Sequence, residues 1–216
     1  MSETREPVRV AVNVMRARLT ILGFNLAIIT FQLSNMRTLE GGIMLPGIDF
    51  PVDMAAAAAL FLGLAMSLTA MVAFIASGQL DPVGVCNHWS LLLGDLLMYV
   101  ALSQTVAGFF GPFLFTMGQV SLAELAAAQE FANIHAAVTI AGAVAWAAAH
   151  YLGPVVSLFR SPFGRRTTVA LGGVYLLLVL LIAWITTTAW RLQSSGLGLD
   201  HPDPIWLVGL FAPLYW

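Results

Sequence analysis

The chain has 216 residues, of which 59% are hydrophobic and only 9% are charged, and its mean hydropathy is +0.87. Soluble domains carry about 25% charged residues, so this composition excludes a soluble globular protein and predicts an integral membrane protein. The formal net charge of −2 argues against nucleic-acid binding, which needs a basic face. The single cysteine, Cys86, excludes an internal disulfide.

Several apolar stretches are long enough to cross a bilayer, because a helix of roughly 20 residues spans the ~30 Å hydrocarbon core. The sequence therefore predicts an all-α fold, with residues 1–216 forming a single integral membrane domain. We expect a polytopic bundle of about five transmembrane helices, followed by a short interfacial or re-entrant segment. The expected helices cover residues 8–33, 54–76, 88–117, 131–152 and 168–190, and the terminal segment covers 204–216.

The arginines are unevenly distributed between the two ends of such a bundle. One end holds seven of them, whereas the other holds only Arg37 and Arg191 and collects most of the acidic residues. The positive-inside rule then predicts a cytoplasmic amino terminus and an outer carboxyl terminus. We expect a bacterial inner membrane, with bound lipid. The loop over 36–53 is also apolar, which predicts that it rests on a neighbouring helix or subunit.

The helix expected over 8–33 carries Arg18, Asn25 and Gln32 at heptad spacing, so that they share one face. A hydrophilic face of this kind is able to line a path for protons or ions. In the alternative interpretation, Asn25 and Gln32 form hydrogen bonds with neighbouring helices and hold the bundle together.

The helix expected over 88–117 places His88, Asp95 and Tyr99 on one face. Asp95 is the carboxylate expected well inside the membrane, where it must be paired, hydrated or protonated. It is therefore the best single candidate for a proton acceptor or an ion ligand. The alternative is a hydrogen bond to Asn25, Tyr99 or a backbone carbonyl that locks two helices together.

The helix expected over 131–152 is the one around which we expect the bundle to be organised. Its polar and large residues fall within an arc of roughly 80°, and small apolar residues cover the rest of its surface. These residues are His135, Thr139, Gly142, Trp146 and His150. Because ionisable groups in a membrane must face protein or water, the pattern predicts an interior helix.

Two histidines, His88 and His150, are expected near the cytoplasmic ends of adjacent antiparallel helices. Facing imidazoles of this kind are able to hold a metal ion or haem iron, and ordinary interfacial hydrogen bonds are the alternative. His135 lies about 22 Å from His150 along its helix, and no second histidine faces it for a two-haem arrangement. No complete catalytic motif is found, which leaves enzymatic activity open.

Three short fragments resemble subunit III of the haem–copper oxidases. Gly94-Asp95 within LLLGDLLMY resembles the signature of that family's first helix, and IHAAVTIAG at 134–142 is similar to its histidine-bearing helix. The ending, DPIW at 203–206 and FAPLY at 211–215, resembles its closing helix, although the family's second histidine before the glycine is missing. The resemblance implies a subunit without a redox centre, packed beside the catalytic subunit of a respiratory oxidase.

The leading interpretation is a non-catalytic, multi-pass subunit of an energy-converting or oxidative membrane complex. Its internal polar seam would assist proton movement, and its partners would be other membrane subunits. One alternative is a homo-oligomeric ion channel or small transporter, with the polar face of the first or third helix lining the path. A second alternative is a haem-binding electron carrier that uses His88 and His150.

Overall fold

The computed structural model describes residues 6–36, 42–45, 47–80, 88–118, 128–196, 198, 209–211 and 213. The described helical segments are α1 (Glu6–Asn35), α2 (Met54–Leu80), α3 (Trp89–Gly118), α4 (Ala128–Ala147), the π-helical turn η3 (Ala148–Leu152), α5 (Gly153–Phe159) and α6 (Arg165–Gly196). α4, η3 and α5 follow one another without a break, so 5 helical spans are long and apolar enough to cross a membrane. The predicted all-α bundle is thereby confirmed.

The largest difference from the predicted helix ends lies in the fourth span, which continues past 152 to Phe159. Pro154 does not end this span, although proline lacks the N–H that would bond the carbonyl four residues earlier. That carbonyl belongs to His150, and the hydroxyl of Tyr175 on α6 donates a hydrogen bond to it at 2.5 Å. A neighbouring helix therefore satisfies the backbone oxygen that proline leaves free.

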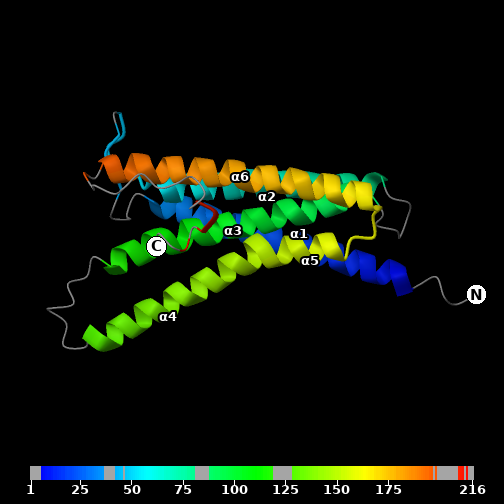
Figure 1. Cartoon of the computed structure of the whole chain (residues 1–216), viewed down its shortest axis with the longest axis horizontal. Helices are drawn as coiled ribbons and strands as arrows, with labels where there is room; N and C mark the ends of the chain where they lie inside the picture. The colour runs from blue at the N-terminus through cyan, green and yellow to red at the C-terminus, as the bar shows by residue number, and fades with distance from the viewer. Residues whose placement is uncertain are drawn as a thin grey trace, which may run out of the picture.

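The centre of the bundle is α3, which contacts each of the other helical segments (Figure 1). In its most apolar stretch 67% of the residues are buried, against 11% in the span Ala128–Phe159. The expectation that the helix over 131–152 is interior is therefore wrong for the single chain. Figure 1 shows the reason, because the amino-terminal half of α4 departs from α3 and leaves the bundle.

The most extensive packing between two helices joins α2 and α3. Gly94 faces the ring of Phe74, and Gly108 faces the side chain of Leu60. A Cβ atom added at either glycine would lie 2.6 Å from the facing side chain. Small residues at such contacts let membrane helices pack backbone against backbone.

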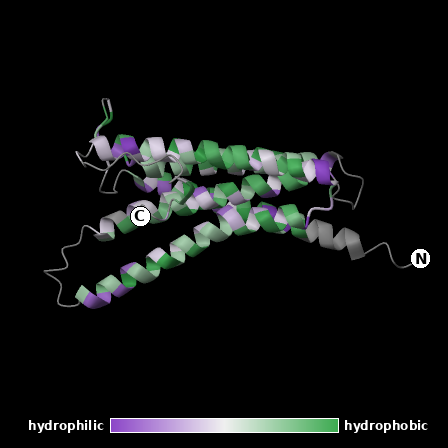
Figure 2. Ribbon diagram, viewed as in Figure 1, coloured by the Kyte–Doolittle hydropathy of each residue, from purple (hydrophilic) through white to green (hydrophobic). Residues whose placement is uncertain are grey.

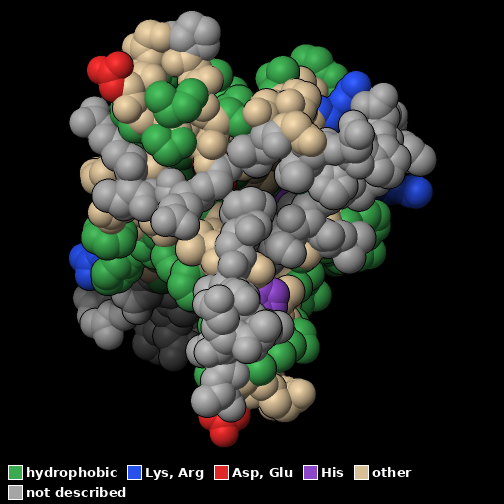
Figure 3. Space-filling model, turned by 90° about the vertical axis from the view of Figure 1, so that its left-hand side faces the viewer, with side chains coloured by type: hydrophobic (Ala, Val, Ile, Leu, Met, Phe, Trp, Pro, Cys, Tyr) green, Lys and Arg blue, Asp and Glu red, His purple; other side chains and the backbone are tan. Residues whose placement is uncertain are grey.

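The outer faces of the helices are apolar along most of their length, and hydrophilic residues collect mainly at the helix ends (Figure 2). Large exposed side chains on these faces include Phe24, Phe31, Phe61, Val72 and Leu177. Figure 3 views the end of the bundle where α4 begins and shows Asp and Glu side chains at its outer edge. This distribution is typical of a surface in contact with lipid.

The loop before α2 packs on α6, as the apolar residues of the 36–53 segment predict. A Cβ atom added at Gly196 would lie 2.7 Å from Ile43, and the N–H of Ala55 donates to Gln193 Oε1 at 3.0 Å. Asp53 caps α2 by accepting a hydrogen bond from the N–H of Ala56 at 2.9 Å. Burial raises the pKa of the Asp53 carboxyl group above its usual value, although hydrogen bonding to Ala56, Gln193 and Ala55 opposes the shift.

The described part of the terminal segment, Gly209–Phe211 and Pro213, lies beside the middle of α6. A Cβ atom added at Gly209 would collide with the carbonyl of Ala183, which lies about 27 Å from the first residue of α6 and about 20 Å from its last. The hydroxyl of Tyr151 also donates to the carbonyl of Leu210. This placement favours the re-entrant alternative; the rest of 204–216 lies outside the described residues.

Candidate functional site

The first element of the site is an ion pair between α1 and α3. Arg18 Nε lies 2.5 Å from Asp95 Oδ1, and Nη2 lies 2.6 Å from Oδ2, so the guanidinium binds the carboxylate through two parallel hydrogen bonds. The ring of Phe74 covers the guanidinium at 5.8 Å. Asp95 lies six residues into α3, and hence about 9 Å from its first residue.

The partner of Asp95 differs from every partner that the sequence predicted, because neither Asn25, Tyr99 nor a backbone carbonyl takes that place. Asn25 instead donates a hydrogen bond to Ser67 Oγ of α2 at 2.9 Å, and both side chains are buried. Asn25 thus joins α1 to α2, as predicted by the interpretation in which this residue forms a hydrogen bond with a neighbouring helix. Gln32, one heptad further along α1, is half-buried.

The second element continues from Asp95 along α3 in steps of four residues. Tyr99 follows first, and its ring lies against Gly153 at the start of α5. Ser103 follows next, with its Oγ 3.1 Å from Nδ1 of His150. Each step advances about 6 Å along the helix axis, so Asp95, Tyr99, Ser103 and His150 form a polar line into the bundle. We call these four residues the α3 polar line.

The hydroxyl of Ser103 contacts both a backbone carbonyl and the imidazole of His150. Its Oγ lies 2.8 Å from the carbonyl of Val100 and 3.1 Å from Nδ1 of His150. A serine hydroxyl has one proton to donate, so if that proton is given to the Val100 carbonyl, Nδ1–H of His150 donates to Ser103 and Nε2 is the proton acceptor of the imidazole. Nε2 is buried and has no hydrogen-bond partner among the described residues.

Aromatic rings enclose this imidazole. Trp146 stacks on His150 with ring centroids 4.5 Å apart and an interplanar angle of 12°, and Tyr151 meets it edge-on at 4.8 Å. His150 is 2% exposed and Trp146 is 3% exposed. Ser103 lies about 21 Å from the first residue of α3, so the imidazole sits at the middle of the bundle.

The backbone around His150 is unusual as well. It forms the π-helical turn η3, and single π turns inside α-helices occur frequently at functional sites. This turn was not predicted from the sequence, and neither Ser103 nor Tyr175 was selected as a candidate. A signal was present, since Pro154 lies four residues after His150 and frees its carbonyl.

The proposed metal pair of His88 and His150 is wrong in this structure. His88 precedes α3, where its Nδ1 accepts a hydrogen bond from the N–H of Ser90 at 3.3 Å and lies 2.7 Å from Ser90 Oγ. His150 contacts Ser103, fifteen residues after His88 and about 22 Å further along α3. The two imidazoles are apart because the fourth span continues to Phe159. No group of three or more potential metal ligands occurs within the described ranges.

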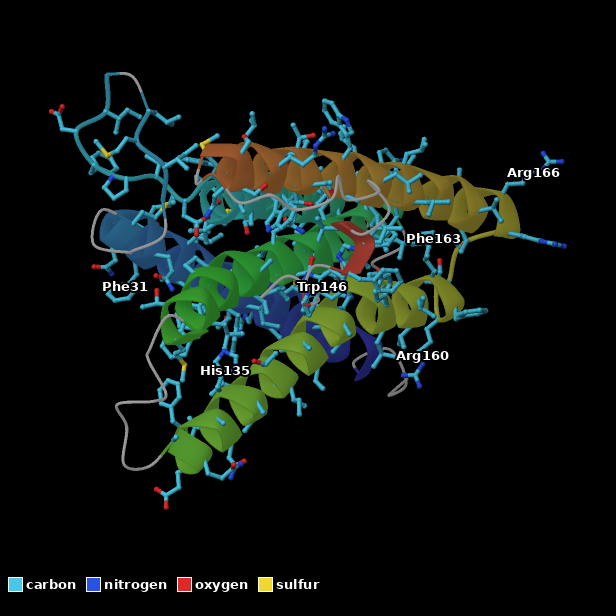
Figure 4. All side chains as sticks on the ribbon, turned by 60° about the vertical axis from the view of Figure 1, so that its left-hand side comes forward. Phe31, His135, Trp146, Arg160, Phe163 and Arg166 are labelled. Carbon is cyan, nitrogen blue, oxygen red and sulfur yellow. The ribbon has the colours of Figure 1, made fainter. Side chains whose placement is uncertain are left out.

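The polar stripe of α4 comprises His135, Thr139, Gly142 and Trp146, and burial decreases along it toward His135 because the amino-terminal half of α4 departs from α3. Gly142 and Trp146 are buried, whereas His135 and Thr139 are half-buried. The Thr139 hydroxyl donates to the carbonyl of His135 at 2.8 Å. His135 lies on the side of α4 that faces α3 (Figure 4). The stripe therefore points inward as predicted, but α3 covers only its second half.

The site thus combines a closed ion pair near one end of α3 with a buried imidazole in mid-bundle. Its chemistry is that of proton acceptance and donation, because tyrosine, serine and histidine side chains in one line all carry exchangeable protons. Comparisons of the chain with protein-family models, with curated proteins and with solved structures find no match.

Proposed function

We propose that the chain is a multi-pass subunit of an energy-converting or oxidative membrane complex, in which the α3 polar line helps a proton to move. The observation that carries this proposal is Nε2 of His150, which is buried in mid-bundle without a hydrogen-bond partner among the described residues. The proposed orientation keeps the amino terminus in the cytoplasm, so that the line runs inward from that side.

Stability alone does not account for such an imidazole. A buried polar atom without a partner costs the fold about 1–3 kcal/mol, and natural proteins keep few of them. Ionisable residues inside membrane spans are rare for the same reason, and they mark proton and ion pathways. Histidine is the side-chain type in this line that most readily accepts and releases a proton.

The second part of the proposal, assembly with other chains, is supported by α4. This helix leaves α3 while its polar stripe continues to His135, which is only half-buried. A histidine within a span needs protein or water beside it, so a helix of a partner subunit would complete the surroundings of His135. This role agrees with the one that the resemblance to subunit III implies.

The alternatives have less support. Arg18 and Asn25 are both bonded within the chain, so a homo-oligomeric channel would need a path lined by other residues. A haem carrier based on His88 and His150 would need imidazoles that approach one iron, and these two bind partners far apart on α3. A haem Soret band that disappears in His150→Ala would nevertheless support the haem-binding electron carrier.

The composition of the assembly is tested by mass spectrometry of the complex after gentle solubilisation with its native lipids. We expect this chain together with different membrane chains. A uniform homo-oligomer that conducts ions in liposomes would instead establish the channel alternative.

Proton movement is tested by reconstituting that complex with a pH-sensitive dye. His150→Phe preserves the ring stacked on Trp146 and removes the proton acceptor, so we expect proton throughput to fall at least about 100-fold, the lower end of the contribution of a positioned acid–base group. Ser103→Ala should lower it less, and His88→Phe, which replaces a histidine outside the α3 polar line, is the matched control. Unchanged throughput in His150→Phe with an intact complex would refute the proton role.

A further inference from the structure

Three arginines surround the turn that joins α5 and α6. Arg160 precedes this turn, Arg165 and Arg166 begin α6, and all three side chains are exposed at one end of the bundle (Figure 4). None of them has an acidic partner in the described part of the chain, where the ion pair found is Arg18–Asp95. No acidic side chain within the described ranges therefore competes with an external anion for their charge.

The backbone that carries these arginines is held firmly. Ser161 Oγ accepts hydrogen bonds from the N–H of Phe163 at 3.2 Å and from the hydroxyl of Thr168 at 3.2 Å. Phe163 packs on a cluster that includes Leu92 and Leu171, which ties the turn to α3 and α6. A rigid base lowers the entropic cost of binding, because the positions of the charged groups are already set.

The segment before the turn between α5 and α6 also carries an exposed aromatic ring. Phe159, the last residue of α5, is 88% exposed and directly precedes Arg160. Basic residues beside exposed Phe or Leu side chains are typical of the boundary between lipid headgroups and acyl chains. This combination suits a position in which the arginines meet the lipid phosphates and the ring meets the acyl region.

We infer that residues 159–166 bind the headgroup of an acidic phospholipid. Guanidinium groups bind phosphate oxygens through paired hydrogen bonds, and the three positive charges complement a phosphodiester that has no neutralising choline. Phe159 favours a lipid over a free anion, because only a lipid brings an acyl chain to the ring. This inference is independent of the proposed role of the α3 polar line.

The test titrates the full chain, in neutral detergent micelles, with phosphatidylglycerol and counts bound lipids by native mass spectrometry. Each arginine near an acidic lipid contributes about fivefold in affinity, so the triple variant Arg160→Gln/Arg165→Gln/Arg166→Gln should bind on the order of 100-fold more weakly. Arg191→Gln, at the other end of α6, is the matched control and should change the affinity less than about twofold.

Further measurements distinguish the lipid from other anions. Phe159→Ala should weaken phosphatidylglycerol binding, whereas phosphatidylcholine should bind poorly to every variant and inorganic phosphate should not compete at millimolar concentration. Equal binding of phosphatidylcholine, competition by inorganic phosphate, or an equal loss in Arg191→Gln would each overturn the inference. So would unchanged affinity in the triple variant, whose fold is verified by its thermal unfolding.

Discussion

The ion pair between Arg18 and Asp95 gives the sharpest stability prediction. Removing one partner of a buried pair costs about 3–5 kcal/mol, because the other charge stays behind without compensation. The two partners differ in exposure, since the side chain of Arg18 is 22% exposed and that of Asp95 is 9% exposed. A long arginine side chain is also able to turn toward the end of the bundle, which a short aspartate is not.

Because of this asymmetry, we expect Arg18→Met to lower the free energy of unfolding by about 4 kcal/mol and Asp95→Leu by about 2 kcal/mol. The double variant removes both charges and fills their space with apolar atoms, which is often neutral or stabilising. We expect it to lie within about 1 kcal/mol of the natural chain. The coupling energy of the cycle is then at least about 5 kcal/mol in magnitude, because the two single losses sum to about 6 kcal/mol and the double variant loses at most about 1 kcal/mol.

The assay is unfolding in mixed micelles with a rising fraction of dodecyl sulfate, followed by circular dichroism. Arg16→Met is the matched control, because Arg16 is exposed two residues earlier on α1, and its effect should stay within about 0.5 kcal/mol. Single effects that are below about 1 kcal/mol and add up in the double variant would refute the reasoning. Such a result would mean that water solvates both groups.

Further variants test three other features, which are the Asp53 helix cap, the Tyr175 hydrogen bond and the Gly153–Tyr99 contact. Burial raises the pKa of Asp53, so its folded state holds a proton more tightly than the unfolded chain, and its contribution to stability improves as the pH falls through the folded pKa. Asp53→Asn should therefore stabilise the protein at neutral pH and flatten this part of the pH profile of the melting temperature. Asp53→Ala should instead lower the free energy of unfolding by about 1 kcal/mol, because the helix cap is lost. Tyr175→Phe leaves the carbonyl of His150 without its donor and should cost about 1 kcal/mol in the same micelle assay; no loss would mean that the π turn satisfies this oxygen itself. Gly153→Ala forces a methyl group into the ring of Tyr99 and should cost about 1–3 kcal/mol, and a second substitution, Tyr99→Ala, should recover part of that loss.

The helical spans were predictable because apolar stretches of the length of a bilayer leave few alternatives. The expected helix over 54–76 is observed as Met54–Leu80, and the one over 88–117 as Trp89–Gly118. The end of the fourth span was not predictable in the same way. Local chemistry at Gly153-Pro154 indicates a break, whereas the hydroxyl of Tyr175, which comes from another helix, donates to the carbonyl that loses its N–H partner.

The candidate site was predictable in its members but not in its pairings. Arg18, Asp95 and His150 are conspicuous because ionisable groups in apolar helices are costly. Heptad spacing identifies the face on which each lies, yet it does not say which helix packs against that face. The sequence therefore predicted no partner for Arg18, and Ser103 was overlooked because a serine within a span costs little by itself.

The π turn has a consequence for aligning this chain with homologous sequences. One additional residue in a helix rotates the residues before it by about 100° relative to the residues after it. Shortening 148–152 by a residue would therefore swing His135 and Trp146 toward the acyl chains while α5 stayed in place. Alignments should admit a gap at this turn, since otherwise they would compare the inner surface of one helix with the outer surface of another.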